Sequence, residues 1–292
     1  MNPGVVYAFA AFAIWGLFPI YFKALHSISP IEMLAHRMAW SMIFLLIVLT
    51  VLRKWQWIVP VMRDKRLLVR FAASAVLLSS NWGLYIWAVN AGHIVEASLG
   101  YFINPLVNVL FGMAFLHERL RPVQWIAVVI AAAGVVWLTI VNGAPPWISF
   151  ALALTFGGYG LLRKTASLGA LEGLTLETMI LCPVALLYLY FLNAHGGSGF
   201  MEASLGVKLL LAAAGPVTAV PLLLFAAGAR RIPLSMLGLI QYITPSLQLL
   251  IGVLIYGEFF GHDQLIGYGA IWAALLLYSA ESIFWAKAAR SA

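Results

Sequence analysis

Polar side chains recur at helical spacing inside an apolar stretch, residues 93–116, that is long enough to cross a bilayer. Tyr101, Asn104 and Asn108 are three and four residues apart, so they lie on one face of a helix. Hydrocarbon cannot satisfy phenol and amide groups, so this face must contact protein or water. Aromatic rings beside amide groups are typical of small-molecule sites, and the pattern therefore favours binding of a ligand.

The same pattern returns 140 positions later, for example from Tyr101 to Gln241, and each copy contains a proline. Proline has no N–H, so Pro105 leaves the carbonyl of Tyr101 without its helical partner. The second stripe consists of Gln241, Thr244, Gln248 and Pro245. We expect the two prolines to act as helix-breaking hinges. The alternative for the amides, above all for Asn108 and Gln248, is that they hydrogen-bond only to neighbouring helices.

A third polar and aromatic cluster lies in residues 79–90, with Asn81, Trp82 and Tyr85 on one helical face. These side chains would place a stacking surface beside an amide group. The alternative is an aromatic belt at the membrane surface, but Trp82 and Tyr85 lie near the middle of the expected span.

Ionisable residues at the start of another expected span are also functional candidates, because charges inside membranes are costly. Glu32 and His36 are one helical turn apart, and Arg37 follows directly. One alternative is a structural ion pair between Arg37 and Glu96. If transport is coupled to protons, Glu96, His36 or Glu32 would carry them. A different class of function, an intramembrane enzyme, would use Glu32, His36 and Arg37 near the outer face.

The amino-acid composition indicates the class of protein to which these residues belong. Of 292 residues, 63% are hydrophobic and 9% are charged, whereas charged residues make up about a quarter of soluble proteins. We predict an all-α integral membrane protein with ten transmembrane helices and very short connections, the first apolar stretch being retained. The predicted spans are 4–22, 30–51, 69–91, 94–116, 123–142, 147–165, 174–193, 207–228, 233–256 and 264–286.

The basic residues predict the orientation of the chain. Most of the 17 Lys and Arg residues fall in connections that are cytoplasmic if the amino terminus is cytoplasmic. Lys23 and Lys208 fall on the other side, and Arg37 lies inside a span. The positive-inside rule therefore predicts that both termini are cytoplasmic.

The repeated pattern predicts two domains, residues 1–143 and 144–292, with five spans each. Phe12 corresponds to Phe156, and Glu32 corresponds to Glu177. Because five is odd, the second repeat enters the membrane inverted relative to the first, an arrangement typical of secondary transporters.

Several function classes lack support in the sequence. The single Cys182 allows no disulfide framework, and no metal-ligand spacing, phosphate-binding loop or hydrolase motif is present. We therefore expect no metal, no cofactor, no nucleic-acid partner and no enzymatic activity. Glu118 and Glu258, at equivalent places after the two polar stripes, would cap the next helix or form gate contacts.

Five segments together resemble a known family: IEMLAHRMAWS (31–41), NWGLYIWAVN (81–90), EASLGYFINPLVNVLFG (96–112), YGLLRK (159–164) and GLIQYITPSLQLL (238–250). They are similar to the RarD branch of the EamA-type drug/metabolite transporters, and the resemblance covers essentially the whole chain.

The resemblance implies a bacterial inner-membrane exporter of small metabolites or drugs, with an amphenicol-type compound as one solute. It also implies a cavity among spans one, three, four, six, eight and nine, lined by Trp15, Asn81, Trp82, Tyr85, Tyr101, Asn104, Tyr159, Gln241, Tyr242 and Thr244. We predict a secondary transporter whose partners are a small-molecule solute, the lipid bilayer and, if transport is coupled, protons. An importer on the same fold and a non-transporting scaffold are alternatives.

Overall fold

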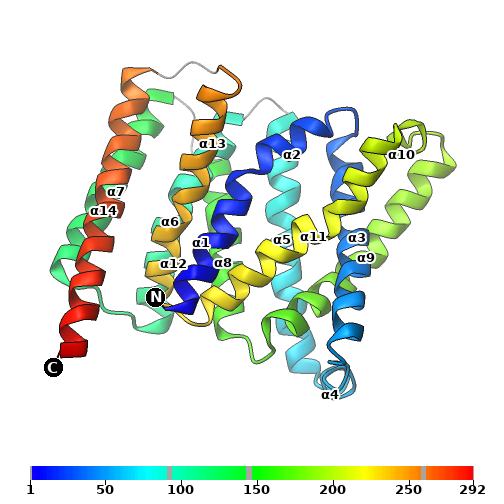
Figure 1. Cartoon of the computed structure of the whole chain (residues 1–292), viewed down its shortest axis with the longest axis horizontal. Helices are drawn as coiled ribbons and strands as arrows, with labels where there is room; N and C mark the ends of the chain where they lie inside the picture. The colour runs from blue at the N-terminus through cyan, green and yellow to red at the C-terminus, as the bar shows by residue number, and fades with distance from the viewer. Residues whose placement is uncertain (1, 91–93, 143–146, 258–260, 292) are drawn as a thin grey trace.

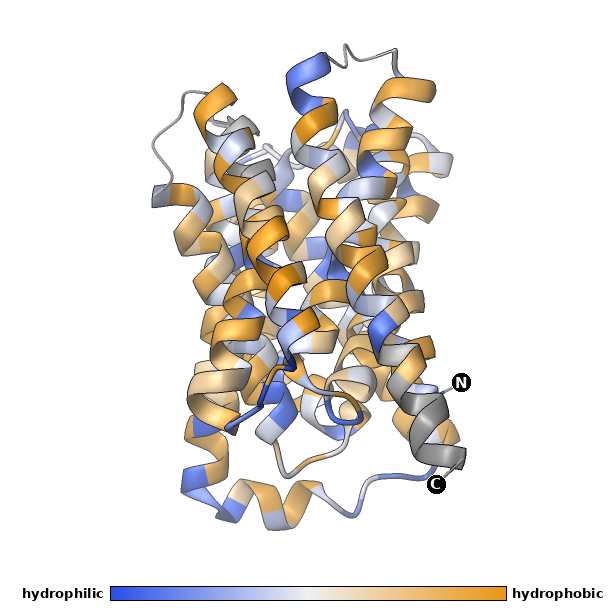
Figure 2. Ribbon diagram, turned by 90° about the vertical axis from the view of Figure 1, so that its left-hand side faces the viewer, coloured by the Kyte–Doolittle hydropathy of each residue, from blue (hydrophilic) through white to orange (hydrophobic). Residues whose placement is uncertain are grey.

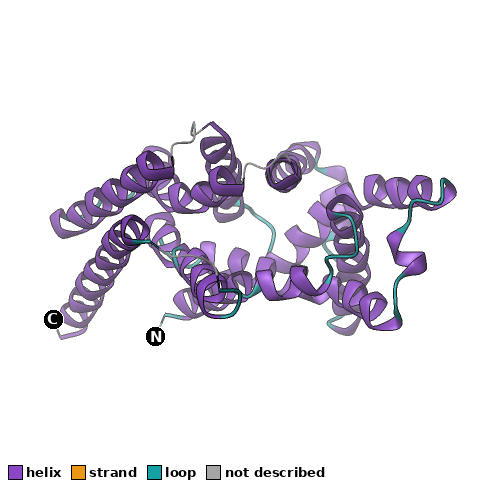
Figure 3. Cartoon of the chain, turned by 90° about the horizontal axis from the view of Figure 1, so that it is seen from above, coloured by secondary structure: helices purple, strands orange, loops and turns teal. Residues whose placement is uncertain are grey.

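The computed structural model describes residues 2–90, 94–142, 147–257 and 261–291, and the described chain is helical with short loops (Figure 3). The prediction of an all-α protein is confirmed. The helices are α1 (Pro3–Gly16), α2 (Phe18–Ala24), α3 (Pro30–Val51), α4 (Ile58–Arg63), α5 (Lys65–Asn90), α6 (Ile94–Leu116), α7 (Pro122–Asn142), α8 (Trp147–Thr165), α9 (Ala170–Ala194), α10 (Gly199–Glu202), α11 (Leu205–Ala229), α12 (Leu234–Gln241), α13 (Ile243–Leu254) and α14 (His262–Ser291).

Among the described residues, seven segments are long and apolar enough to cross a membrane. Apolar residues cover the middle of most helices, whereas hydrophilic residues gather toward the ends (Figure 2). The other three expected spans, 94–116, 147–165 and 264–286, coincide with α6, α8 and α14. The count of ten spans stays a prediction.

Polar caps determine where several helices begin. The Asn2 side chain accepts a hydrogen bond from the backbone N–H of Gly4, and Ser29 caps α3 in the same way through the N–H of Glu32. Asp64 accepts hydrogen bonds from the first turn of α5, at 3.0 Å from the nitrogens of Arg66 and Leu67. At a rise of about 1.5 Å per residue, Arg37 lies about 10 Å along α3 from the start of this helix.

Two of the predicted spans are each divided into two helices. The first is divided into α1 and α2 at Leu17, and Pro19 follows at the start of α2. The ninth is divided into α12 and α13 at Tyr242, three residues before Pro245. In contrast, α6 continues through Pro105. The two breaks lie close together: α1 packs against both α12 and α13, and Gln248 of α13 donates a hydrogen bond to the carbonyl of Trp15 at the end of α1.

The helices pack as a broad bundle with α7 and α14 along one edge and α3, α9 and α11 on the opposite side (Figure 1). Helices α1, α5, α6, α8, α12 and α13 fill the centre. The α6–α12 contact is close at Gly238, where a Cβ atom would lie 2.7 Å from the carbonyl oxygen of Pro105. Only glycine permits that approach.

The two ends of the bundle differ in the elements that they carry. Helices α2 and α10 lie at one end, and α4 lies at the other (Figure 1). Both chain ends lie toward the α4 end of the bundle (Figures 1 and 2).

Candidate functional site

A cavity of about 470 Å³ lies where the broken helices α1/α2 and α12/α13 face α3, α5 and α6. Small-molecule sites typically have volumes of about 300–1,000 Å³. The lining extends to the exposed residues His26 and Pro30 at the turn between α2 and α3, so the cavity is open at that end. At the other end Phe12, Phe156 and Leu222 form its floor.

Seven residues that were predicted to line a cavity do line this one: Trp15, Asn81, Trp82, Tyr85, Tyr101, Gln241 and Thr244. Their aromatic rings form much of the wall. The ring of Tyr85 meets that of Tyr101 edge-on at 5.7 Å, and Trp15 meets Phe156 at 5.8 Å. Such a wall offers flat apolar surface to a solute, while the phenol hydroxyls remain available for hydrogen bonds.

The side chains of Asn81, Thr244 and Gln248, unlike the phenol hydroxyls, are already used in contacts between helices. Asn81 donates hydrogen bonds to the carbonyl of Leu152 and to the hydroxyl of Thr155 on α8. Thr244 donates to the carbonyl of Phe12 at 2.8 Å. Gln248 donates to the carbonyl of Trp15 at 3.3 Å, the group that Pro19 leaves without a helical donor. Much of the hydrogen-bonding capacity of these side chains therefore holds the broken helices in place.

Three other residues that were predicted for the cavity lie outside its lining. Asn104 is 2% exposed and donates to the carbonyl of Ala153, and it also accepts a hydrogen bond from Asn108. The hydroxyl of Tyr242 donates to the carbonyl of Phe102, next to the carbonyl that Pro105 frees. Tyr159 is fully buried beneath the cavity floor.

Amides from the two stripes meet directly. Asn108 donates one hydrogen bond to Asn104 and another, at 3.1 Å, to the side-chain oxygen of Gln241. For Asn104 and Asn108 the observed geometry is the interhelical alternative.

Arg37 is the cationic side chain of the deep part of the lining. Its Nε donates to the hydroxyl of Thr218 at 2.9 Å, and its guanidinium carbon lies 4.9 Å from the ring centroid of Trp82. The rings of Phe22 and Phe18 are 5.4 and 5.7 Å away. Taking such a charge out of water costs several kcal/mol, and each cation–π contact returns about 0.5–2 kcal/mol. The rings compensate the charge in part.

Glu32 and His36 turn away from Arg37. The Glu32 carboxylate accepts hydrogen bonds from the Ser198 hydroxyl and from the backbone N–H groups of Gly199 and Phe200, so it caps α10. Nε2 of His36 lies 4.0 Å from this carboxylate, and the ring of His36 packs on that of Phe200.

The Glu32, His36 and Arg37 side chains therefore do not converge on one substrate position, as an enzyme using all three would require. The side chain of Glu96 lies outside the described part of the chain. Within the described residues, no group of His, Cys, Asp or Glu side chains could hold a metal ion.

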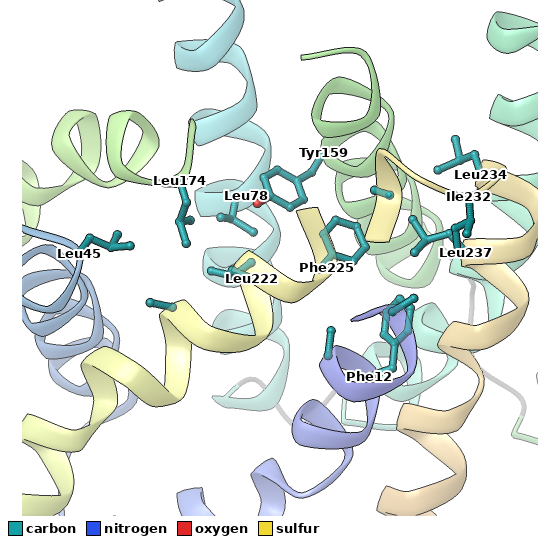
Figure 4. Close-up of a cluster of buried hydrophobic side chains, with 14 residues drawn as sticks. Phe12, Leu45, Leu78, Tyr159, Leu174, Leu222, Phe225, Ile232, Leu234 and Leu237 are labelled. Carbon is teal, nitrogen blue, oxygen red and sulfur yellow. The ribbon is translucent and has the colours of Figure 1, made fainter. Parts of the chain in front are cut away.

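Below the floor, buried apolar side chains pack in a cluster around Phe225 of α11, with Phe12 and Tyr159 among the leucine and isoleucine residues (Figure 4). Phe225 stacks on Tyr159 at 5.8 Å with an interplanar angle of 14°. Its ring also lies 5.5 Å from Phe156, 5.7 Å from Trp15 and 5.9 Å from Phe12. The cluster thus joins α1, α8 and α11, and it separates the cavity from the far end of the bundle.

A charged network lies beyond this cluster. The carboxylate of Glu118 accepts hydrogen bonds from the N–H groups of Leu234 and Ser235 at 2.7 and 3.0 Å. Lys164 donates to the carbonyl of Ile232 at 2.6 Å and lies 4.0 Å from Glu118. Glu118 therefore caps α12, a helix far along the chain, and not the helix that follows it. Glu258 lies outside the described residues.

Some lining residues are not evident from the sequence. Phe18 and Phe22 on α2, and Phe156 on α8, resemble lipid-facing or core residues within apolar runs. Pro19 is a detectable signal, because a proline inside an apolar run predicts a helix break. No local pattern indicates that Arg37 faces a cavity, since that depends on how α3 is rotated against α5 and α11.

Comparison with known proteins identifies the family. A model of the EamA-like transporter family matches residues 2–140. The chain is 45% identical to "Protein RarD" of Streptomyces exfoliatus over 99% of this chain and 91% of that protein. It is 46% identical to "Uncharacterized transporter YojE" of Bacillus subtilis, over 99% and 97% of the two chains. "Chloramphenicol-sensitive protein RarD" of Pseudomonas aeruginosa is 37% identical, over 96% and 94%.

A solved structure described as "Crystal structure of protein" has the same fold, with a TM-score of 0.71 and 20% identity over 95% of this chain and 97% of that one. The similarity to these relatives and the apolar helices agree on a membrane transporter. The chain therefore belongs to the RarD branch of the EamA-like transporter family and is a multi-pass transporter of the bacterial inner membrane.

Proposed function

We propose that the protein exports small, partly aromatic or amino-acid-like solutes, including amphenicol-type compounds, by alternating access. The observation that carries this proposal is the aromatic cavity of about 470 Å³, open at one end and closed at the other by the Phe225 cluster. A solute held between the rings of Trp15, Trp82 and Tyr85 would be released at the open end. Closure there, with opening at the Phe225 cluster, would complete the cycle.

The orientation in this proposal comes from the basic residues. With cytoplasmic termini, the α2–α3 turn faces outward and the Glu118–Lys164 network faces the cytoplasm. The structure would then be the outward-facing state. Two inverted repeats, residues 1–143 and 144–292, would supply the second state, because exchanging the conformations of the repeats turns an outward opening into an inward one.

Trp82→Leu tests the cavity assignment. Removing a stacking ring should weaken apparent chloramphenicol affinity about tenfold in thermal-shift titrations of the purified protein, and should lower chloramphenicol flux in proteoliposomes. Trp87→Leu is the matched control: Trp87 lies on the same helix, is 47% exposed and packs against Trp147. It should retain both properties.

Equal losses in the two variants, or unchanged affinity and flux in Trp82→Leu, would contradict the cavity assignment. Conversion of chloramphenicol in detergent, where no compartments exist, would favour an enzyme over a transporter. Faster accumulation in right-side-out than in inside-out vesicles would favour the importer.

A further inference from the structure

We infer that Arg37 is the anchor for a carboxylate, and that the preferred solute is a monoanion with a flat aromatic body. This inference rests on the proposed function, because it names the solute class for the same cavity.

The first step is the charge of the cavity. No Asp or Glu side chain of the described residues lines it, while Arg37 does. No carboxylate in the described part of the chain lies within ion-pair distance of the guanidinium, either. Arg37 therefore gives the cavity a positive charge inside the membrane, which an anionic solute would neutralise.

The second step is the geometry of the guanidinium. The hydroxyl oxygen of Thr218 accepts a hydrogen bond from Nε of Arg37 at 2.9 Å. No described residue accepts a hydrogen bond from either Nη group. Neither Nη is among the buried atoms that lack a partner, so both reach the open space of the cavity. Thr218 thus fixes the side chain while its paired Nη donors stay free for a carboxylate.

The third step is the surroundings of that position. Trp82 lies 4.9 Å from the guanidinium carbon, and Tyr85 and Tyr101 line the same wall. Neither phenol hydroxyl has a hydrogen-bond partner among the described residues, so each can donate a hydrogen bond to a bound anion. A solute whose carboxylate meets Arg37 would have its apolar part against these rings.

The aromatic rings alone would bind anionic, neutral and cationic solutes, but the positive charge of Arg37 distinguishes between them. One guanidinium neutralises one carboxylate, whereas a phosphate dianion would leave negative charge in the membrane. The ammonium group of an amino acid or amine would find no carboxylate among the described lining residues. We therefore expect an aromatic monocarboxylate to bind more tightly than the matching amide, zwitterion or cation.

Four matched probes test this order: 3-phenylpropionate, 3-phenylpropionamide, phenylalanine and phenethylamine. The full-length protein, purified in a neutral detergent, is titrated with each by thermal shift. We expect 3-phenylpropionate to bind at least about tenfold more tightly than the amide, and Arg37→Gln to remove that difference. Arg37→Lys, which keeps the charge but not the paired donors, should retain part of it.

Two controls keep the result interpretable. Binding of 3-phenylpropionamide to Arg37→Gln reports that the cavity is intact. Lys208→Gln removes a cation outside the cavity, 5.8 Å from the ring of Phe200, and should leave the order of the four probes unchanged.

Equal affinity of carboxylate and amide, or a preference that persists in Arg37→Gln, would overturn the inference while leaving the proposed function standing. Arg37-dependent stabilisation by phosphatidylglycerol, with none by 3-phenylpropionate, would also overturn it, because the anion would then be a lipid headgroup. If chloramphenicol and all four probes fail to bind, the proposed function fails as well.

Discussion

At the residue scale, the polar side chains of the membrane interior have two distinct roles. Asn104 and Asn108 are 2% and 1% exposed and hydrogen-bond to neighbouring helices. Arg37 instead lines an open cavity, and its Nε donates to the hydroxyl of Thr218. An amide satisfied by a carbonyl is neutral and contributes to packing, whereas a charge without a carboxylate partner in the described chain favours an incoming anion.

A second arginine inside the bundle, Arg163, has the opposite environment. Arg163 of α8 and Glu177 of α9 are each 1% exposed, and the Nη1 of Arg163 lies 3.6 Å from the Glu177 carboxylate. The hydroxyl of Ser74 on α5 donates to the same carboxylate at 2.5 Å, and Arg163 also donates to the carbonyl of Ala170. These contacts join three helices, so we interpret the pair as structural.

Glu177→Ala should therefore lower the free energy of unfolding by about 3–5 kcal/mol, because it leaves Arg163 buried without its counter-ion. The double variant Glu177→Leu, Arg163→Met should recover most of that loss, since replacing a whole buried pair by apolar groups is often neutral. Thermal unfolding of the purified proteins measures both effects.

Arg231→Met is the control for the loss of a single exposed cation, and its effect should stay below about 1 kcal/mol. A double variant as unstable as Glu177→Ala would show that the pair itself, rather than an uncompensated charge, stabilises the bundle.

At the element scale, the cavity depends on helices that stop and restart. The breaks at Leu17 and Tyr242 place Trp15, Phe18, Gln241 and Thr244 around one space. Side chains replace backbone hydrogen bonds that are missing at the breaks. Gln248, for example, donates a hydrogen bond to the carbonyl of Trp15. Non-helical backbone at a helix break is tolerated inside a membrane where it lines a cavity. Helix breaks are also positions at which transporters can bend.

Pro245→Ala should restore a donor for the carbonyl of Gln241 and straighten the junction between α12 and α13. If this junction moves during transport, chloramphenicol flux in proteoliposomes should fall several-fold while chloramphenicol still binds. Pro183→Ala is the matched control, because Pro183 lies inside α9 at an exposed position outside the cavity lining. Unchanged flux in Pro245→Ala, or the same fall in both variants, would argue against a hinge at this junction.

At the scale of the whole molecule, the cavity is open at one end of the bundle, and two layers of contacts close the other end. The Phe225 cluster closes it with apolar contacts, and Glu118 and Lys164 close it with polar contacts to the turn between α11 and α12. In the proposed cycle, opening that end would separate α11 and α12 from α1 and α8. It would break the contacts of Lys164 with the carbonyls of Ala229 and Ile232 and would separate the rings around Phe225.

The predicted orientation, with both termini in the cytoplasm, can be tested directly. A fluorescent protein fused after Ala292 should be fluorescent, because it would remain in the cytoplasm, whereas alkaline phosphatase inserted at residues 195–199 should be active outside it. The reciprocal fusions are the controls and should be inactive. The opposite result for both reporters would invert the assignment of the open end and, with it, the proposed outward-facing state.

The sequence by itself determined the class of fold and much of the cavity wall. Apolar stretches of about 20 residues specify helical spans, because a helix satisfies its own backbone in lipid. Helical spacing placed Asn81, Trp82 and Tyr85 on one face, and all three line the cavity. The motifs from 31–41 to 238–250 are sufficient to indicate the family.

Only the tertiary structure decided which polar groups are free. Spacing places Asn104 and Tyr101 on the same stripe, yet Asn104 meets the carbonyl of Ala153 while Tyr101 faces the cavity. The rotation of each helix against its neighbours makes that distinction. For the same reason Glu32, five residues before Arg37, became a cap for α10, while Arg37 reached the cavity. The hydrogen-bond partners of the Glu32 and Arg37 side chains come from segments more than a hundred residues away, and no local pattern specifies them.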